Sequence, residues 1–321
     1  MIQKDILQFL TYLKSAQTAQ KYLEECYEKN EIKEANKYSY ENSDRFLYYL
    51  EHGLQFYEAG KASGITVKPI LYFYGMVHLL KACLLTRKPN YPENTAMLAH
   101  GVSTRKRKKQ DYAFLQDEVK VQHKGLFPYF VKHLYHMDRI PYEKIDMHKL
   151  LVTIPELNEL FYFHTGKHPL IKVSHLHEKK VHIPTVLLDH YHLTEESLLE
   201  KLMKHLPDVE HVNKVDSSLE IELSRSLTPD SKGPFFFHME ESAFFLPGKR
   251  QYFLSSHEVM HHYLILYNLS MICRYETEWW GDLLHTMPTE DYPFIEQFLS
   301  VTSEKVPILL GYFLLNEKGV R

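Results

Sequence analysis

The chemically most specific motif in the sequence is the pentapeptide HEVMH at residues 257–261, which matches the H-E-x-x-H pattern of zinc hydrolases. Residues four apart on a helix share a face, so His257 and His261 can hold one zinc ion while Glu258 activates its water. A tetrahedral site needs a third protein ligand, but leucine and tyrosine stand where the extended motif has glycine and histidine. A zinc-dependent hydrolase is therefore an alternative prediction, and zinc is a cofactor only under that alternative.

The same stretch also has the features of a structural helix start. Ser255 at the N-cap and Glu258 three residues later form a capping box, which engages the carboxylate that catalysis would need. The residues that follow are apolar on nearly every side, which predicts a buried helix. The chain contains 21 His, so chance matches to histidine motifs are frequent. The same caution applies to His175 and His177, which share one face if they lie on a strand.

One run of residues concentrates positive charge, and it consists of Arg105, Lys106, Arg107, Lys108 and Lys109. Such a run neutralises phosphates, and Tyr112 and Phe114 follow closely enough to stack on bases. The whole chain has 38 Lys and Arg against 41 Asp and Glu, a formal net charge of −3. Because no overall positive field attracts nucleic acid, the sequence confines a phosphate or RNA contact to this run.

Several classes of protein find no support in the sequence. The glycine-rich loops of nucleotide-binding enzymes and the G-x-S-x-G motif of serine hydrolases are absent. The three cysteines form no C-x-x-C pair, which fits a reducing cytoplasm. The N-terminus lacks the cationic start of a secretory signal, and the longest apolar stretch, residues 70–85, contains His78 and Lys81 and is too short to span a bilayer. We therefore expect a cytoplasmic protein without a membrane partner.

The first part of the chain, residues 1–104, is predicted to be helical. Asn42 and Ser43 are expected to cap a helix whose apolar residues repeat every three to four positions. Pro69 suits the first turn of the next helix, which ends before Pro89 and is apolar on most sides. That helix is predicted to lie at the centre of the fold.

The middle part, residues 105–254, is predicted to mix short strands with short helices. EVKV at residues 118–121 and SLEIEL at residues 218–223 alternate apolar and polar residues, as strands with one buried face do. A short helix is expected after Thr194, which is followed by two glutamates in its first turn.

The last part, residues 255–321, is predicted to return to helix. New helices are expected to begin at Ser255, Thr277, Asp291 and Ser303. Because no Gly/Ser linker or repeat divides the chain, residues 1–321 are predicted to form a single unit. The expected fold is mainly α-helical α+β, with N- and C-terminal helices packed around a small β-containing middle.

Four segments carry a resemblance: LYFYGMVHLLKACLL (71–85), AHGVSTRKRKK (99–109), EVKVQHKGLFPYF (118–130) and LILYNLSMICRYETEWWG (264–281). Together they resemble the YaaC-like family of bacterial proteins, and they extend over most of the chain. The resemblance implies a cytoplasmic protein. It brings no catalytic residues that could be transferred to this sequence.

The helix at residues 69–85, followed by His-Gly at 100–101, is more remotely similar to the core of HEPN-type helical domains, many of which bind or cut RNA. Their usual catalytic signature is an arginine, four to six residues, and then a histidine. The resemblance therefore implies candidate pairs for a metal-independent ribonuclease: Arg45 with His52, and Arg250 with His257.

The leading prediction is a non-catalytic cytoplasmic binding or interaction protein. Its ligand is predicted to be RNA or another phosphate-bearing molecule, bound through Arg105 to Lys109. The HEPN-like ribonuclease and the zinc hydrolase remain the enzyme alternatives. A protein partner and a homodimer also remain open.

Overall fold

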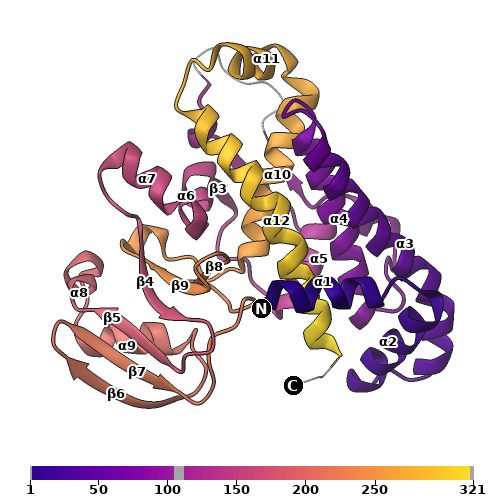
Figure 1. Cartoon of the computed structure of the whole chain (residues 1–321), viewed down its shortest axis with the longest axis horizontal. Helices are drawn as coiled ribbons and strands as arrows, with labels where there is room; N and C mark the ends of the chain where they lie inside the picture. The colour runs from indigo at the N-terminus through magenta and orange to yellow at the C-terminus, as the bar shows by residue number, and fades with distance from the viewer. Residues whose placement is uncertain (1, 105–111, 319–321) are drawn as a thin grey trace. The chain divides into compact units, whose positions relative to one another are not determined.

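The computed structural model describes residues 2–104 and 112–318 of the chain. Its internal contacts divide the chain into two compact units, one formed by residues 1–147 with 262–321 and the other by residues 148–261. Twelve α-helices and nine short strands lie in the described residues, which confirms the predicted mainly helical α+β fold (Figure 1). The basic run from Arg105 to Lys109 lies outside the described residues.

Unit 1 brings the N- and C-terminal helices of the chain together, as predicted. Figure 1 shows α12 crossing α1 and following α4, and these pairs are in direct contact. The helices of unit 1 are α1 (Ile2–Tyr12), α2 (Ala16–Lys29), α3 (Ala35–Ala62), α4 (Lys68–Arg87), α5 (Leu126–Tyr135), α11 (Thr277–Thr286), α12 (Asp291–Glu317) and, from residue 262 onward, α10 (Glu258–Tyr275).

Helices α3 and α4 pack closely against each other, and α4 is buried over most of its length. Pro69 lies in the first turn of α4, as the sequence predicts. Gly53 on α3 and Gly75 on α4 let the two backbones approach, since a Cβ atom on either glycine would lie 3.1 Å from the carbonyl oxygen of the other. The predicted cap at Asn42 and Ser43 is wrong, because α3 begins seven residues earlier and contains both.

The buried interior of α3 accommodates these polar residues through their own hydrogen bonds. The Asn42 amide donates to the Tyr27 hydroxyl and to the Pro89 carbonyl oxygen, while the Ser43 hydroxyl donates to the Tyr40 carbonyl one turn back. Their preference for helix ends reflects such side-chain bonds, which here form inside a helix, with tertiary partners for Asn42 and with the preceding turn for Ser43.

The last helix, α12, runs without interruption past Ser303 and through Pro307, so the predicted helix start at Ser303 is wrong. Both α4 and α12 are long and apolar enough to cross a membrane by length and composition alone. However, 72% and 78% of their most apolar windows are buried within the structure, as is usual for core helices of soluble proteins.

Unit 1 also contains a small antiparallel sheet in the order β1-β2-β3. Its strands are β1 (Val102–Ser103), β2 (Glu118–Val121) and β3 (Lys144–Asp146), and β2 is the strand predicted from EVKV. The 3-10 helices η1 (Thr95–Leu98) and η2 (Phe114–Gln116) flank it. The sheet belongs with the helices, whereas the sequence placed the first boundary at residue 104.

Unit 2 contains two three-stranded antiparallel sheets, in the orders β4-β9-β8 and β5-β7-β6. The strands are β4 (Leu170–His175), β5 (Lys180–Pro184), β6 (Val209–Val215), β7 (Ser218–Leu223), β8 (Phe236–His238) and β9 (Ala243–Pro247). The helices are α6 (Met147–Val152), α7 (Asn158–Thr165), α8 (Val186–Tyr191) and α9 (Glu195–Met203), with 3-10 turns η3 (Pro155–Leu157) and η4 (Arg250–Tyr252).

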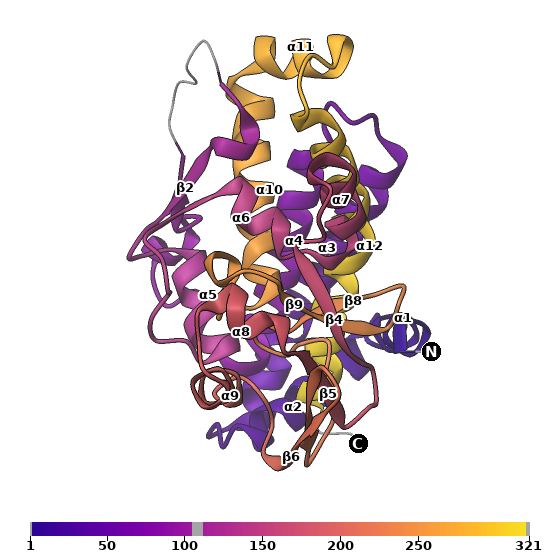
Figure 2. The same cartoon turned by 90° about the vertical axis from the view of Figure 1, so that its left-hand side faces the viewer.

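The core of unit 2 lies between its strands and the helices α8 and α9, which lie beside the strands in Figure 2. In β7 the buried residues Leu219, Ile221 and Leu223 alternate with glutamates, as the sequence predicts. Thr194 caps α9 by accepting a hydrogen bond from the Ser197 backbone N–H, which confirms the predicted start of that helix.

Candidate functional site

The HEVMH motif lies at the start of α10, but the helix begins at Glu258 rather than after Ser255. The predicted capping box is therefore wrong, because His257 occupies the position before the first helical residue, and the Met260 N–H donates to its carbonyl oxygen. His257 thus precedes the helix, and only Glu258 and His261 lie on it.

The His261 imidazole is fully buried between two hydroxyl groups. Its Nδ1 lies 2.7 Å from the Thr153 hydroxyl, and its Nε2 lies 2.6 Å from the Ser256 hydroxyl. The Thr153 hydroxyl donates to the Leu150 carbonyl, so it accepts from Nδ1, and the Ser256 hydroxyl donates to Nε2. This arrangement stabilises a neutral imidazole and engages both its Nδ1–H group and its Nε2 lone pair, so no lone pair is directed at a metal.

The described residues contain no group of three or more His, Cys, Asp or Glu side chains placed to hold a metal ion. The second histidine pair is also separated, because His175 ends β4 whereas His177 lies in the following turn with a φ of 72°. The condition for a shared strand face is therefore not met, and both histidines are exposed.

The first Arg–His pair lies on α3, two turns apart. The Arg45 guanidinium donates to the Asn42 side chain and to the Pro89 carbonyl oxygen. His52 is exposed, and its ring lies edge-on to that of His78, with centroids 5.6 Å apart. Arg45 therefore fixes the segment after α4, while His52 belongs to another group of side chains.

The second Arg–His pair lies in unit 2. Arg250 is exposed on η4, and His257 lies in the segment that leads into α10. Burial and the nearby Arg250 charge lower the pKa of Lys201.

The two aromatic residues predicted to stack beside the basic run have structural roles. Phe114 is fully buried. The Tyr112 hydroxyl donates to Asp117 at 2.8 Å, and the Tyr112 ring packs edge-on against Trp279. The prediction that both residues are available for base stacking is wrong for Phe114, because its ring forms part of the core.

Five basic side chains gather on unit 1, and we call them the cationic cluster: His52, His78, Lys81, His100 and Arg274. They come from four separate segments, namely α3, α4, the turn before β1, and the last turn of α10. Lys81 and His78 lie one turn apart on α4, so they share a face of a helix that is otherwise almost wholly apolar.

Aromatic rings fill the spaces between the members of the cationic cluster. Phe56 stacks on the His78 ring at 5.7 Å, and Lys81 Nζ lies 5.5 Å from the centre of the Tyr49 ring. The Arg274 guanidinium lies 5.2 Å from the centre of the Tyr275 ring, and Tyr275 is 66% exposed. Bases and aromatic rings of a ligand can therefore meet both cations and ring faces on this surface.

Burial and mutual repulsion perturb three members of the cationic cluster. Burial, with the Lys81 and His52 charges, lowers the pKa of His78 to about 4. Burial also lowers the pKa of Lys81, and burial together with Arg274 and Lys81 lowers that of His100. The Nδ1 atom of His78 is buried without a hydrogen-bond partner. The lowered pKa values of these three residues show that the cluster disfavours additional positive charge.

No carboxylate in the described part of the chain is ion-paired with a member of the cationic cluster, and every charged neighbour that shifts the pKa of His78 or His100 is basic. Within the described ranges, the Arg274 guanidinium donates to three neutral groups, the Ser270 carbonyl, the Tyr74 hydroxyl and the Met271 sulfur. An unbalanced positive surface of this kind is complementary to an anionic ligand.

The cationic cluster is hard to predict from the sequence, because its members are up to 222 positions apart, from His52 to Arg274. The available signal is the presence of two ionisable residues, His78 and Lys81, inside the apolar stretch 70–85. Polar residues at otherwise apolar helix positions are costly unless a partner or ligand compensates them.

The model of the YaaC-like protein family matches residues 11–314, which is nearly the whole chain. The chain belongs to the YaaC-like family. Comparisons with curated proteins and with solved structures find no match. All five members of the cationic cluster lie within the YaaC-like match, but the match itself assigns no role to any residue.

Proposed function

We propose that this YaaC-like protein binds a phosphate-bearing ligand at the cationic cluster, and that this ligand is single-stranded RNA in the cytoplasm. The observation that supports the proposal is the gathering of five basic groups without a carboxylate partner among the described residues. Surface cations in proteins are commonly interspersed with acids, so an unbalanced group attracts an anion.

Lys81 and Arg274 are the permanent charges of the cluster and are proposed to contact phosphate oxygens. An ammonium group acts as a point charge, whereas the planar guanidinium can donate two parallel hydrogen bonds to one phosphate. The neighbouring Tyr49 and Tyr275 rings supply faces on which bases stack. Stacking of this kind tolerates any base, so we expect weak sequence preference.

The histidines of the cluster are proposed to respond to the ligand. His78 is neutral at neutral pH because burial and neighbouring cations lower its pKa. A phosphate beside Lys81 would offset that repulsion and raise the pKa of His78. Ligand binding should therefore strengthen as the pH falls below neutral, as long as the protein stays folded.

The test is a fluorescence-anisotropy titration with a short unstructured RNA over a series of salt concentrations. The Lys81→Ala/Arg274→Ala variant should lower the affinity at least tenfold, and it should reduce the slope of log K against log salt by about 1.4, since each phosphate contact on a single strand contributes about 0.7. Competition with inorganic phosphate and with a mononucleotide separates a polymer site from a site for small phosphates.

Two control variants locate the contact. Lys21→Ala removes an exposed lysine on α2 and should leave the affinity unchanged. Arg105→Ala/Arg107→Ala tests the basic run separately, because a loss with this variant alone would place the contact there. An RNA affinity that is equal in wild type and in Lys81→Ala/Arg274→Ala would contradict the proposal.

The ribonuclease alternative gains one specific observation, which is that His52 lies beside His78 within the cationic cluster. Two imidazoles near a phosphate can act as general base and general acid. Gel analysis of the same RNA after incubation tests this alternative. Cleavage by wild type that is lost in His52→Ala, but kept in His257→Ala, would favour the ribonuclease. Intact RNA in all samples would exclude this ribonuclease and leave the binding proposal as it stands.

A further inference from the structure

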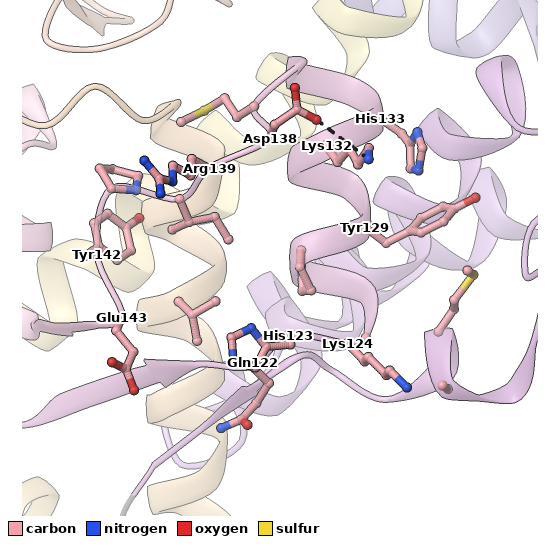
Figure 3. A pocket seen from close by; sticks show the side chains of 18 of the residues that line it. Gln122, His123, Lys124, Tyr129, Lys132, His133, Asp138, Arg139, Tyr142 and Glu143 are labelled. Atoms are coloured by element: carbon pink, nitrogen blue, oxygen red, sulfur yellow. Dashed lines mark ion pairs between the residues drawn. The ribbon is translucent and has the colours of Figure 1, made fainter.

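Unit 1 contains a second candidate site, a pocket of about 960 Å³ beside α5. We call it the α5 pocket. One wall is a face of α5 with Tyr129, Lys132 and His133, and the opposite wall is the segment 137–143 (Figure 3). The turn at residues 122–125 closes one end. The volume lies within the usual range for pockets that bind small organic molecules, about 300–1,000 Å³.

Backbone hydrogen bonds fix both ends of the segment that forms the second wall. The Met137 N–H donates to the Val131 carbonyl on α5, and the Val121 N–H donates to the Glu143 carbonyl. At the closed end, Gly125 has a φ of 120°, and a Cβ atom there would lie 2.5 Å from the backbone of Gly101. The walls are therefore held in place by the fold rather than by a ligand.

The charges around the α5 pocket leave an excess of unpaired cations. Its two carboxylates are each paired with a lysine, Asp138 with Lys132 at 3.7 Å and Glu143 with Lys120 at 2.9 Å. Lys124 and Arg139 also line the pocket, and no carboxylate among the described residues is ion-paired with either of them.

An imidazole in the pocket wall, that of His133, has a lowered pKa. Burial and the Lys88 charge lower the pKa of His133, and the nearby Glu93 opposes this effect only in part. The His133 ring packs 4.3 Å from that of Tyr129, whose hydroxyl donates to Glu93. A neutral imidazole beside cations can donate a hydrogen bond to an anionic oxygen.

Apolar side chains also line the pocket. Five of its side chains supply methylene, methyl or thioether groups: Met97, Val121, Pro128, Met137 and Ile140. Figure 3 places Lys124 and Arg139 on opposite sides of the space, so a bound molecule meets a cation at either side and apolar groups between them. Charged groups would fix such a ligand, and its apolar body would be removed from water.

We propose that the α5 pocket binds a small organic anion that combines a carboxylate, sulfonate or phosphate group with an apolar or aromatic body. A cation at one side of the pocket, Lys124 or Arg139, holds the anionic group, and the apolar side chains between the two sides cover the body. This site is separate from the cationic cluster, and it does not depend on the proposed RNA binding.

The test uses 1-anilinonaphthalene-8-sulfonate, a fluorescent apolar anion, and N-phenyl-1-naphthylamine, which has the same rings without the sulfonate. The folded full-length protein should bind the anionic dye saturably, with one dye per chain. Lys124→Ala/Arg139→Ala should weaken this binding about tenfold or more, because charge-assisted contacts are lost. Binding of the neutral dye should be weaker and should not change in this variant.

Three further variants make the result decisive. Ile140→Trp fills part of the apolar surface and should weaken both dyes, whereas Lys21→Ala should affect neither. Lys81→Ala/Arg274→Ala separates the two sites, because it should remove RNA binding and leave dye binding intact. The proposal is overturned if Lys124→Ala/Arg139→Ala binds the anionic dye as tightly as wild type, if the neutral dye binds equally well, or if the Lys81/Arg274 variant abolishes dye binding.

Discussion

The solvent face of the β5-β7-β6 sheet and the cationic cluster of unit 1 both expose lysine and histidine, but their surroundings differ. On the sheet, Lys180 and His182 lie beside Glu220, at 2.7 and 3.9 Å. In the cluster, Lys81 and His78 have aromatic rings and other cations as neighbours, and no carboxylate among the described residues is ion-paired with them. The two regions contain the same types of basic residue, and they differ in whether carboxylates form ion pairs with those residues.

The role of a histidine in this protein depends on its neighbours, so the number of histidines alone does not indicate a function. A histidine beside a carboxylate or between hydroxyls has its hydrogen bonds satisfied within the protein and stabilises local structure. Neighbouring cations lower the pKa of a histidine and so disfavour its charged form, and a bound anion can raise the pKa again.

The largest effect is expected for His261, whose two ring nitrogens are both hydrogen-bonded in a buried site. His261→Ala should lower the free energy of unfolding by about 2–4 kcal/mol, since it creates a cavity and leaves the Thr153 and Ser256 hydroxyls without this partner. Urea denaturation followed by circular dichroism measures the change. A cost below that of Ser256→Ala would contradict a structural role for the imidazole.

Reversing one charge in the cationic cluster is expected to affect ligand binding strongly. Lys81→Glu should weaken RNA binding about a hundredfold, because it replaces a proposed phosphate contact with a repelling carboxylate. It should also raise the pKa of His78, which NMR titration of the imidazole protons can follow. The matched variant Lys180→Glu, on the sheet of unit 2, should leave RNA affinity unchanged, and an equal loss in both variants would indicate only a general charge effect.

The sequence predicted those parts of the fold that depend on local pattern. The alternation of SLEIEL identified β7, and Pro69 with the apolar run identified α4, because one buried face imposes a period on neighbouring residues. It failed at Asn42, Ser43 and Ser303, since residues that favour helix ends can lie within long helices when tertiary partners, or carbonyl oxygens one turn back, accept hydrogen bonds from their side chains.

The two candidate sites show why function was harder to predict than fold. The cationic cluster is assembled from four segments, and its decisive property is that no carboxylate among the described residues is ion-paired with it, which depends on three-dimensional packing. The walls of the α5 pocket come from a short helix and an irregular segment, neither of which has a motif. The H-E-x-x-H motif instead indicated His257 and His261 as site residues. In the structure the His261 imidazole is hydrogen-bonded between the Thr153 and Ser256 hydroxyls.

A smaller effect is expected from the pH dependence of stability. The pKa of His78 is lowered from 6.5 to about 4, so the unfolded chain binds the proton more readily between these values. Its contribution is fully present above pH 6.5 and is lost as the pH falls toward 4. Because the side chain is partly solvated, we expect about 1 kcal/mol. The pKa of His205 in unit 2 is also lowered to about 4, mainly by burial.

Thermal denaturation across this pH range, with His78→Phe and His205→Phe, separates the two contributions. Each phenylalanine keeps the ring contacts with its aromatic neighbours, Phe56 for the first and Phe253 for the second. Each single variant should show a shallower loss of stability on acidification than wild type, and the double variant should show the shallowest. Profiles that are parallel to wild type would mean that neither imidazole is held neutral by the fold.

The smallest effect is expected at the paired surface of unit 2. Lys180 and Glu220 are linked across adjacent strands, and their charges shift each other's pKa in the stabilising directions, up for Lys180 and down for Glu220. The pair lies at the surface, with Lys180 exposed and Glu220 half-buried, so water and salt screen the interaction and the lost contact is largely replaced by hydration. Lys180→Ala should therefore leave the denaturation midpoint almost unchanged, and any shift should vanish in high salt. A large, salt-resistant shift would show that charge pairing on this sheet contributes to its stability, and the contrast with the cationic cluster would then concern folding as well as ligand binding.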